Sequence, residues 1–185
     1  MVHSRFAAKR LSAALSVIAL VGVGQAAAAK PPVPIRSETA DVFSGRWYEI
    51  ARTPNKLQRE CVGPITDFQG RGGVDLLVTE TCHHPSDGAP HVVRAKARLL
   101  DPGQNTHFRM SFLGGLVHQD YWVLDHADDN AWMIMATPGG NYVWLLSRRP
   151  SLPAAVLATA NAHVAALGFP LTRLVYAGPG DAHGG

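Results

Sequence analysis

The chain has 185 residues, with 17 Lys and Arg, 14 Asp and Glu and a formal net charge of +3, and this length suits one domain. Three of the basic residues and none of the acidic ones fall within residues 1–29, so the remaining chain has 14 of each and is close to neutral. The overall charge therefore gives no indication of a nucleic-acid partner or of strong attraction to an anionic membrane.

The first 29 residues have the organisation of a secretory signal peptide. A charged segment with Arg5, Lys9 and Arg10 precedes an apolar run from Leu11 to Gly24 and small residues that suit a cleavage site. The run is shorter than the about 20 residues that a transmembrane helix needs, which argues against an uncleaved anchor. No cysteine lies near the cleavage site. We therefore expect a soluble mature protein, periplasmic or secreted, with no lipid anchor.

Composition divides the rest of the chain into three parts. The Pro-rich residues 30–37 predict an extended N-terminal arm. Residues 38–178 are expected to form one domain, and the Gly-rich residues 179–185 are expected to form a flexible tail.

The only two cysteines are Cys61 and Cys82. An exported chain meets oxidising conditions, so we predict a disulfide between them, with two free thiols as the alternative. A hairpin turn centred between Arg71 and Gly72 would place the two cysteines opposite each other. Their Cα atoms would then lie about 4.5–5.5 Å apart, which is within the range of a disulfide.

Short runs of β-forming residues, separated by turn signals rich in Gly, Pro and Asp, begin at Gly45. They predict eight strands, over residues 45–53, 61–70, 73–82, 91–100, 106–113, 119–125, 130–137 and 141–149. Period-2 alternation is clearest in the fourth strand, and it indicates that one face is buried and the other is wet. The inward set there is Val93, Ala95, Ala97 and Leu99, against Arg94, Lys96 and Arg98.

One helix is expected after the strands. Ser151 suits its N-cap and Pro153 its first turn. Gly168 suits its end, because glycine accepts the left-handed conformation. A last short strand is expected over residues 172–177. The apolar face of the helix would carry Leu157, Ala160, Val164 and Leu167.

Three segments resemble lipocalins. Residues 45–52, GRWYEIAR, are similar to the opening of that family, whose Gly-x-Trp motif is met by Gly45 and Trp47. The run looks particularly like bacterial lipocalins, plant temperature-induced lipocalins and apolipoprotein D. Residues 120–125 are a looser match, and residues 141–148 resemble the strand that supplies the family's arginine, here Arg148. The resemblance covers about residues 38–178. It implies an all-β fold, an eight-stranded antiparallel up-and-down β-barrel with a C-terminal α-helix and a short ninth strand.

The resemblance also assigns structural roles. Trp47 would plug the closed end of the barrel, and Arg148 would lie across its indole as a cation–π contact worth about 0.5–2 kcal/mol. Gly45 would let the chain enter the barrel without a side chain in the way. Bacterial members of this branch often carry a lipid-modified cysteine at the mature N-terminus, and this sequence has none.

An eight-stranded barrel is wide enough to hold one small ligand, and an apolar lining suits an acyl chain. The resemblance therefore implies that the chain carries or scavenges a fatty acid or lysophospholipid in the periplasm, for envelope maintenance. Transient outer-membrane contact and a homodimer are further expectations. The alternative is that the inward side chains only fill a core. The candidate ligand contacts are Leu76, Val78, Val93, Ala95, Phe108, Met110, Tyr142 and Trp144.

No catalytic motif is present, neither Gly-x-Ser-x-Gly nor His-Glu-x-x-His. Glu49 and Glu80 form a carboxylate pair only if the fold happens to bring them together. The adjacent His83 and His84 point to opposite faces of a strand, so no metal site or cofactor is expected. The alternative to a binding protein is an isomerase or a haem-binding protein on the same barrel. Either would need an inward ionisable group with a perturbed pKa, or a histidine inside the cavity.

Overall fold

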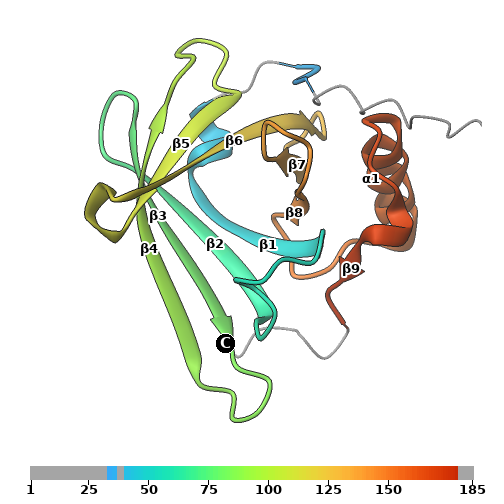
Figure 1. Ribbon diagram of the computed structural model, residues 1–185. Coiled ribbons are helices and arrows are strands. Elements are labelled where there is room, and N and C mark those ends of the chain that lie inside the picture. Colours follow the sequence, from blue (N-terminus) through green and yellow to red (C-terminus); the bar gives the residue numbers. More distant parts are fainter. Residues whose placement is uncertain (1–32, 37–39, 179–185) are drawn as a thin grey trace, which may run out of the picture.

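The computed structural model describes residues 33–36 and 40–178 (Figure 1), so the predicted signal peptide and the predicted tail lie outside the described residues. Eight strands form one antiparallel sheet in which chain neighbours pair, and β1 pairs with both β8 and β2. That pairing closes the sheet and confirms the predicted up-and-down barrel. The strands are β1 (Gly45–Arg52), β2 (Val62–Gly70), β3 (Asp75–His83), β4 (Pro90–Leu99), β5 (His107–Phe112), β6 (Val117–His126), β7 (Trp132–Ala136) and β8 (Val143–Ser147).

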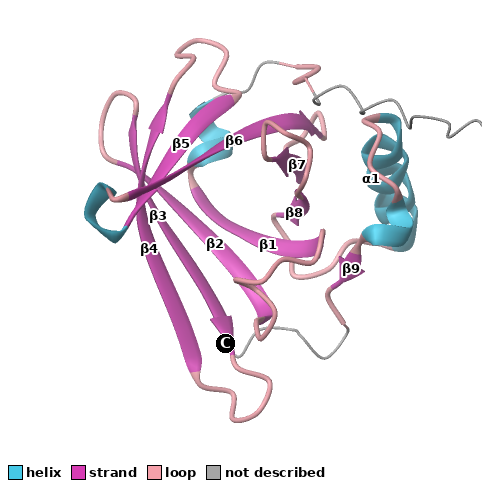
Figure 2. Ribbon diagram, in the orientation of Figure 1, coloured by secondary structure: helices cyan, strands magenta, loops and turns pink. Residues whose placement is uncertain are grey.

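A helix and a short strand follow the barrel, as predicted. The helix α1 (Ala154–Ala166) packs outside the barrel beside β7 and β8 (Figure 2), and β9 (Val175–Tyr176) pairs with β1. The predicted N-cap is wrong, because the residue before the helix is Pro153, with ψ 145°, and no side chain caps it. A proline disfavours helical geometry in the residue before it, so the helix cannot begin at Leu152. Gly168 ends the helix with φ 92°, as predicted.

Two apolar cores lie on the two sides of the barrel wall. The inner core fills part of the barrel, and the outer core joins the wall to α1. Strand β7 contributes to both, so all five of its residues are buried. The outer core includes Ile50, Ala51, Leu124, Trp132, Ile134, Ala136, Val143, Leu145, Ala160, Val164 and Phe169.

A buried carboxylate holds the helix to the barrel. Asp125 on β6 is fully buried and bonds to the Nδ1 atom of His163 on α1. Arg36 Nε lies 3.5 Å from the same carboxylate, and the Ile35 N–H donates to the Leu124 carbonyl at 2.9 Å. A buried charge is tolerated when it is paired in this way. The contact therefore fixes both α1 and residues 35–36 against one end of β6.

The predicted hairpin register is wrong, although the predicted disulfide is confirmed. Thr66 lies opposite Glu80, so the turn is centred on Gly73 and not between residues 71 and 72. Gly72 and Gly73 both have positive φ, which glycine adopts readily, and they place the turn further along the chain. An irregularity between Val62 and Ile65 also breaks the ladder. The bonded pair Cys61 and Cys82 is therefore not directly opposite in register, with Cα atoms 5.4 Å apart.

Candidate ligand-binding site

One end of the barrel is closed by Trp47. Its indole is fully buried and donates to the Val42 carbonyl at 2.9 Å. The guanidinium carbon of Arg148 lies 3.8 Å from the ring centroid, and its Nη1 donates to the carbonyls of Ser44 at 2.6 Å and Arg46 at 3.0 Å. A cation over an indole face is attracted by the ring quadrupole. The structure thus gives Trp47 and Arg148 the geometry that the family resemblance implies.

Five of the eight candidate ligand contacts lie in the inner core. None of them is more than 7% exposed, and they pack with Phe43, Phe68 and Trp47. The rings of Phe43 and Phe108 are 5.3 Å apart in an edge-to-face arrangement, which is a favourable packing geometry. These side chains fill the barrel next to its closed end, and their role as ligand contacts stays a prediction. The five are Leu76, Val78, Ala95, Phe108 and Met110.

The other three candidates lie closer to the opposite end. Val93 on β4 is partly exposed and pairs with Glu80. Trp144 is partly exposed, and its ring lies 5.7 Å from that of Tyr121. Tyr142 precedes β8 and is 38% exposed. It is therefore a residue of the rim and does not belong to the buried interior.

A cavity of about 390 Å³ opens at this second end, and none of the eight candidates lines it. It lies between the β1–β2 loop and the inner face of the β3–β4 hairpin. His84 Nδ1 lies 3.8 Å from Glu60 Oε2, and the rings of His84 and His91 are 6.3 Å apart. Sequence reasoning missed it because six of the eight lining residues lie in loops. Counting the β3 alternation on from Val78 would have found Cys82 and His84. The lining is Lys56, Leu57, Arg59, Glu60, Cys61, Cys82, His84 and His91.

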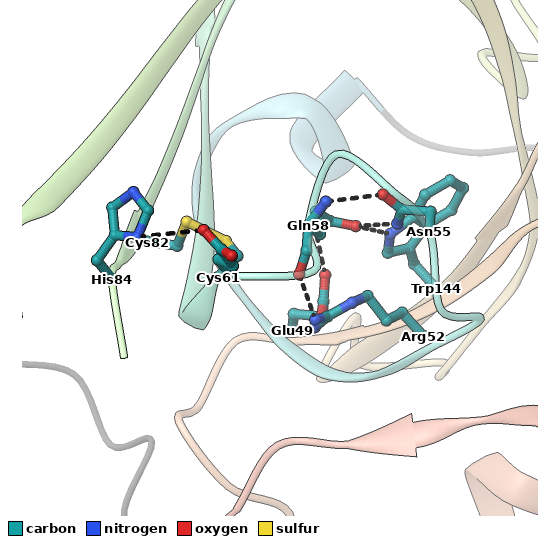
Figure 3. The surroundings of a disulfide bond; sticks show 9 residues. Glu49, Arg52, Asn55, Gln58, Cys61, Cys82, His84 and Trp144 are labelled. Carbon is teal, nitrogen blue, oxygen red and sulfur yellow. Dashed lines mark hydrogen bonds and ion pairs between the residues drawn. A yellow bond between two sulfur atoms is a disulfide. The ribbon is translucent and has the colours of Figure 1, made fainter. Parts of the chain in front are cut away.

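The β1–β2 loop is fastened into the barrel by Gln58 (Figure 3). Its Nε2 donates to Glu49 at 3.0 Å, and its Oε1 accepts from Trp144 Nε1 at 3.1 Å and from Asn55 at 2.5 Å. Its carbonyl accepts from Arg52 Nη2 at 2.9 Å. Seven polar atoms of a loop and of two strands are thereby satisfied together. The loop consequently forms one fixed wall of the cavity.

The interior is not purely apolar, as the predicted lining implied, because Glu49 and Glu80 both lie inside the barrel. Glu49 is 4% exposed and bonds to Arg52. Burial raises the pKa of Glu49, against the opposing effects of Arg52 and Gln58. Burial, and then the charge of Glu49, raise the pKa of Glu80 to about 7. The alternation of β1 and β3 was readable from the sequence, but the distance between the two carboxyl groups was not, because it depends on the register of both strands with β2.

The enzyme alternative required an inward-facing ionisable group with a perturbed pKa, and Glu80 is such a group. No described residue donates a hydrogen bond to Glu80. In the described part of the chain, no three His, Cys, Asp or Glu side chains are grouped to hold a metal ion. The described helices include none of the length and apolarity needed to cross a membrane.

A model of the "lipocalin-like domain" matches residues 39–179. The chain belongs to the lipocalin family. Within it, the chain falls in the branch of the bacterial lipocalins and apolipoprotein D, as the GRWYEIAR segment indicated. It is 23% identical to the outer membrane lipoprotein Blc of Vibrio cholerae, over 77% of this chain and 84% of that protein. Mouse apolipoprotein D is 25% identical over 67% of this chain and 69% of its own length.

Solved structures agree on the fold. Insecticyanin from the tobacco hornworm Manduca sexta has a TM-score of 0.62 with 18% identity, covering 80% of this lipocalin and 84% of that chain. At this identity the likeness concerns the barrel alone. Membership of this family supports the binding of a small hydrophobic ligand as the general activity of the chain.

Proposed function

We propose that this lipocalin binds a single-chain amphiphile, a fatty acid or a lysophospholipid, and carries or scavenges it in the periplasm for envelope maintenance, without catalysis. The relative from Vibrio cholerae is described as an outer membrane lipoprotein, which supports an envelope location. The partly exposed Val93 and Trp144 give an alkyl chain an apolar surface between the mouth and the packed inner core.

The observation that carries the proposal is the charge of the cavity at the mouth. Two permanent cations, Lys56 and Arg59, and two histidines line it, against the single acid Glu60. Cationic side chains bind carboxylate and phosphate groups as point charges or bidentate pairs. An anionic head group at the mouth pairs with these cations. The alkyl chain, directed into the barrel, then contacts its apolar side chains.

Native mass spectrometry of the delipidated chain tests this proposal, with dodecanoate, a lysophospholipid and haem as separate probes. We expect one tightly held acyl lipid per chain. The double variant Lys56→Ala and Arg59→Ala should weaken lysophospholipid binding by about threefold to tenfold, the effect of two exposed charges.

The matched control is Lys96→Ala with Arg98→Ala, which removes the same charge from the exposed face of β4. It should leave the affinity unchanged. Equal losses in both double variants would show that net charge and not the mouth is responsible. No lipid adduct on the folded wild-type chain, or an adduct with haem alone, would contradict the proposal.

The rim of the mouth fits a lipid surface. Leu57 in the β1–β2 loop is 95% exposed, and Leu113 and Leu116 at the β5–β6 turn are 75% and 86% exposed. Both connections lie at the same end because successive strands run in opposite directions. Exposed leucines beside Lys56 and Arg59 match the composition of an interfacial membrane contact. The proposed partner is the anionic surface of a bilayer, which would deliver or accept the ligand.

Replacing Leu57 and Leu116 with Asn should reduce co-sedimentation with phosphatidylglycerol–phosphatidylethanolamine vesicles by about tenfold, since each leucine loses its apolar insertion energy. The control Leu100→Asn changes a residue that is 38% exposed just after β4, at the closed end. It should leave vesicle binding unchanged. If the Leu57 and Leu116 variant sediments like wild type, the rim is not the contact.

A further inference from the structure

Glu80 is a carboxyl inside the barrel that forms no ion pair with a cationic side chain of the described residues. It follows Leu76 and Val78 on the inner face of β3, and it pairs with Thr66 of β2 and Val93 of β4. No hydrogen bond or ion pair to Glu80 occurs among the described residues. Burying an unpaired carboxylate is costly, and a fold that retains one needs another reason for it.

The ionisable groups around Glu80 do not compensate it. Glu49 from β1 and the phenol of Tyr121 from β6 are close enough for their charges to interact with it. Arg52, from β1, is engaged by Glu49 and by the carbonyl of Gln58. When Glu49 and Glu80 are both ionised, Arg52 balances only one of the two negative charges. Further out lie the charged or titratable groups of the mouth, Lys56, Arg59, Glu60, His84 and His91.

Glu80 lies where an entering ligand would meet it. The cavity lining includes Cys82 and His91, which pair across β3 and β4. Glu80 and Val93 form the next inward-facing pair along the same two strands, about 7 Å deeper at the usual rise of a strand. Glu80 keeps some accessible surface, whereas Val78 and Ala95, one pair deeper still, are buried. A molecule that enters through the cavity therefore reaches Glu80 before the packed core.

We propose that Glu80 is the polar ligand contact inside the barrel, and that it selects amphiphiles able to donate a hydrogen bond at this depth, through a hydroxyl or an ammonium, over simple carboxylates. A lysophospholipid has a free glycerol hydroxyl a few bonds inward of its phosphate, so a phosphate at the mouth leaves that hydroxyl near Glu80. A fatty acid has no such donor. The inference rests on the proposed function and names the ligand class more narrowly.

The proton of Glu80 makes this selectivity depend on pH. Burial and Glu49 raise its pKa to about 7, so the carboxylate fraction rises from about one tenth at pH 6 to about nine tenths at pH 8. An ammonium ligand binds the carboxylate form and gains affinity as pH rises. A ligand that brings its own carboxylate, or that covers Glu80 with an alkyl chain only, binds the protonated form and loses affinity. By linkage each effect amounts to about tenfold over this interval.

Calorimetric titrations of the delipidated chain with dodecylammonium and dodecanoate at pH 6 and pH 8 test the proposal. Both probes keep one charge state over this range. For wild type we expect dodecylammonium to bind about tenfold tighter at pH 8 than at pH 6, and dodecanoate about tenfold weaker. Glu80→Gln should abolish most of both dependences. Asp75→Asn, which removes an exposed acid at the start of β3, at the closed end of the barrel, should retain them.

The outcomes separate the two proposals. If both probes bind and Glu80→Gln keeps the wild-type pH dependence, the assignment of Glu80 is wrong and the proposed function stands. If neither probe binds wild type or variant at either pH, both proposals fail. Folding of the variant is checked by urea unfolding. A carboxyl whose folded pKa is raised costs stability as pH rises from its unfolded value of 4.5 to its folded value of about 7, so Glu80→Gln should equal wild type below pH 4.5 and exceed it at pH 8.

Discussion

Replacing Trp47 with alanine should lower the free energy of unfolding by about 3–5 kcal/mol, the usual cost of deleting a buried large aromatic side chain. Trp47 is fully buried, and the change removes its hydrogen bond to Val42 and the ring beneath Arg148. The guanidinium would then lie over a cavity, and the closed end of the barrel would lose its plug. Urea unfolding followed by far-ultraviolet circular dichroism measures the effect.

Trp144→Ala is the matched control, because it deletes the same side chain near the mouth. Trp144 is partly exposed, and its main polar contact is the 3.1 Å hydrogen bond to Gln58. We expect a loss of at most about 2 kcal/mol. Trp47→Phe, which keeps a ring but not the N–H, should fall between the two. A larger loss for Trp144→Ala than for Trp47→Ala would overturn the division between a structural closed end and a ligand-binding mouth.

Removing the disulfide is expected to cost about 3 kcal/mol. Cys61 and Cys82 are separated by 21 residues, and a loop of this size loses about that much entropy in the unfolded chain when it is closed. The double variant Cys61→Ala and Cys82→Ala should unfold at lower urea concentration, with reduction of wild type having the same effect. Both cysteines line the cavity, so ligand affinity should fall as well.

Thiol titration in denaturant gives an independent check. Wild type should show no reactive thiol before reduction and two after it. Reductant should not change the urea midpoint of the double variant. That result would show that reductant destabilises wild type by breaking this disulfide. Two reactive thiols in protein purified from an oxidising compartment would contradict the assignment.

The fold was largely predictable from local signals. Alternation on β4 and turn residues between the strands placed eight strands to within a few residues, and the Gly-x-Trp segment indicated how the barrel begins. The helix end was predictable from Gly168 because left-handed geometry restricts the residue type. The helix start was not, since Ser151 and Pro153 compete and the effect of proline on the preceding residue prevails.

The register of the strands and the depth of the side chains in the barrel were less predictable from the sequence. Gly70, Gly72 and Gly73 each permit a turn, and the sequence does not say which one sets the pairing of β2 with β3. The disulfide was predicted correctly from compartment and cysteine number, although the pairing used to support it was wrong. Inner-face alternation identified Leu76, Val78, Ala95, Phe108 and Met110 as inward residues. It could not say that they fill the barrel, since that depends on how far across it the opposite strands lie.

The sequence by itself determined the family, the barrel, the closed end at Trp47 and Arg148 and the choice of disulfide partners, because each depends on residue type and on short spacings along one strand. Only the tertiary structure decided the site. It brought Gln58 from a loop onto Glu49 and Trp144, and it placed Glu80 close enough to Glu49, on the two strands that flank β2, for their charges to interact. Burial and electrostatic interactions depend on distances between residues far apart in the chain, and period-2 patterns do not contain those distances.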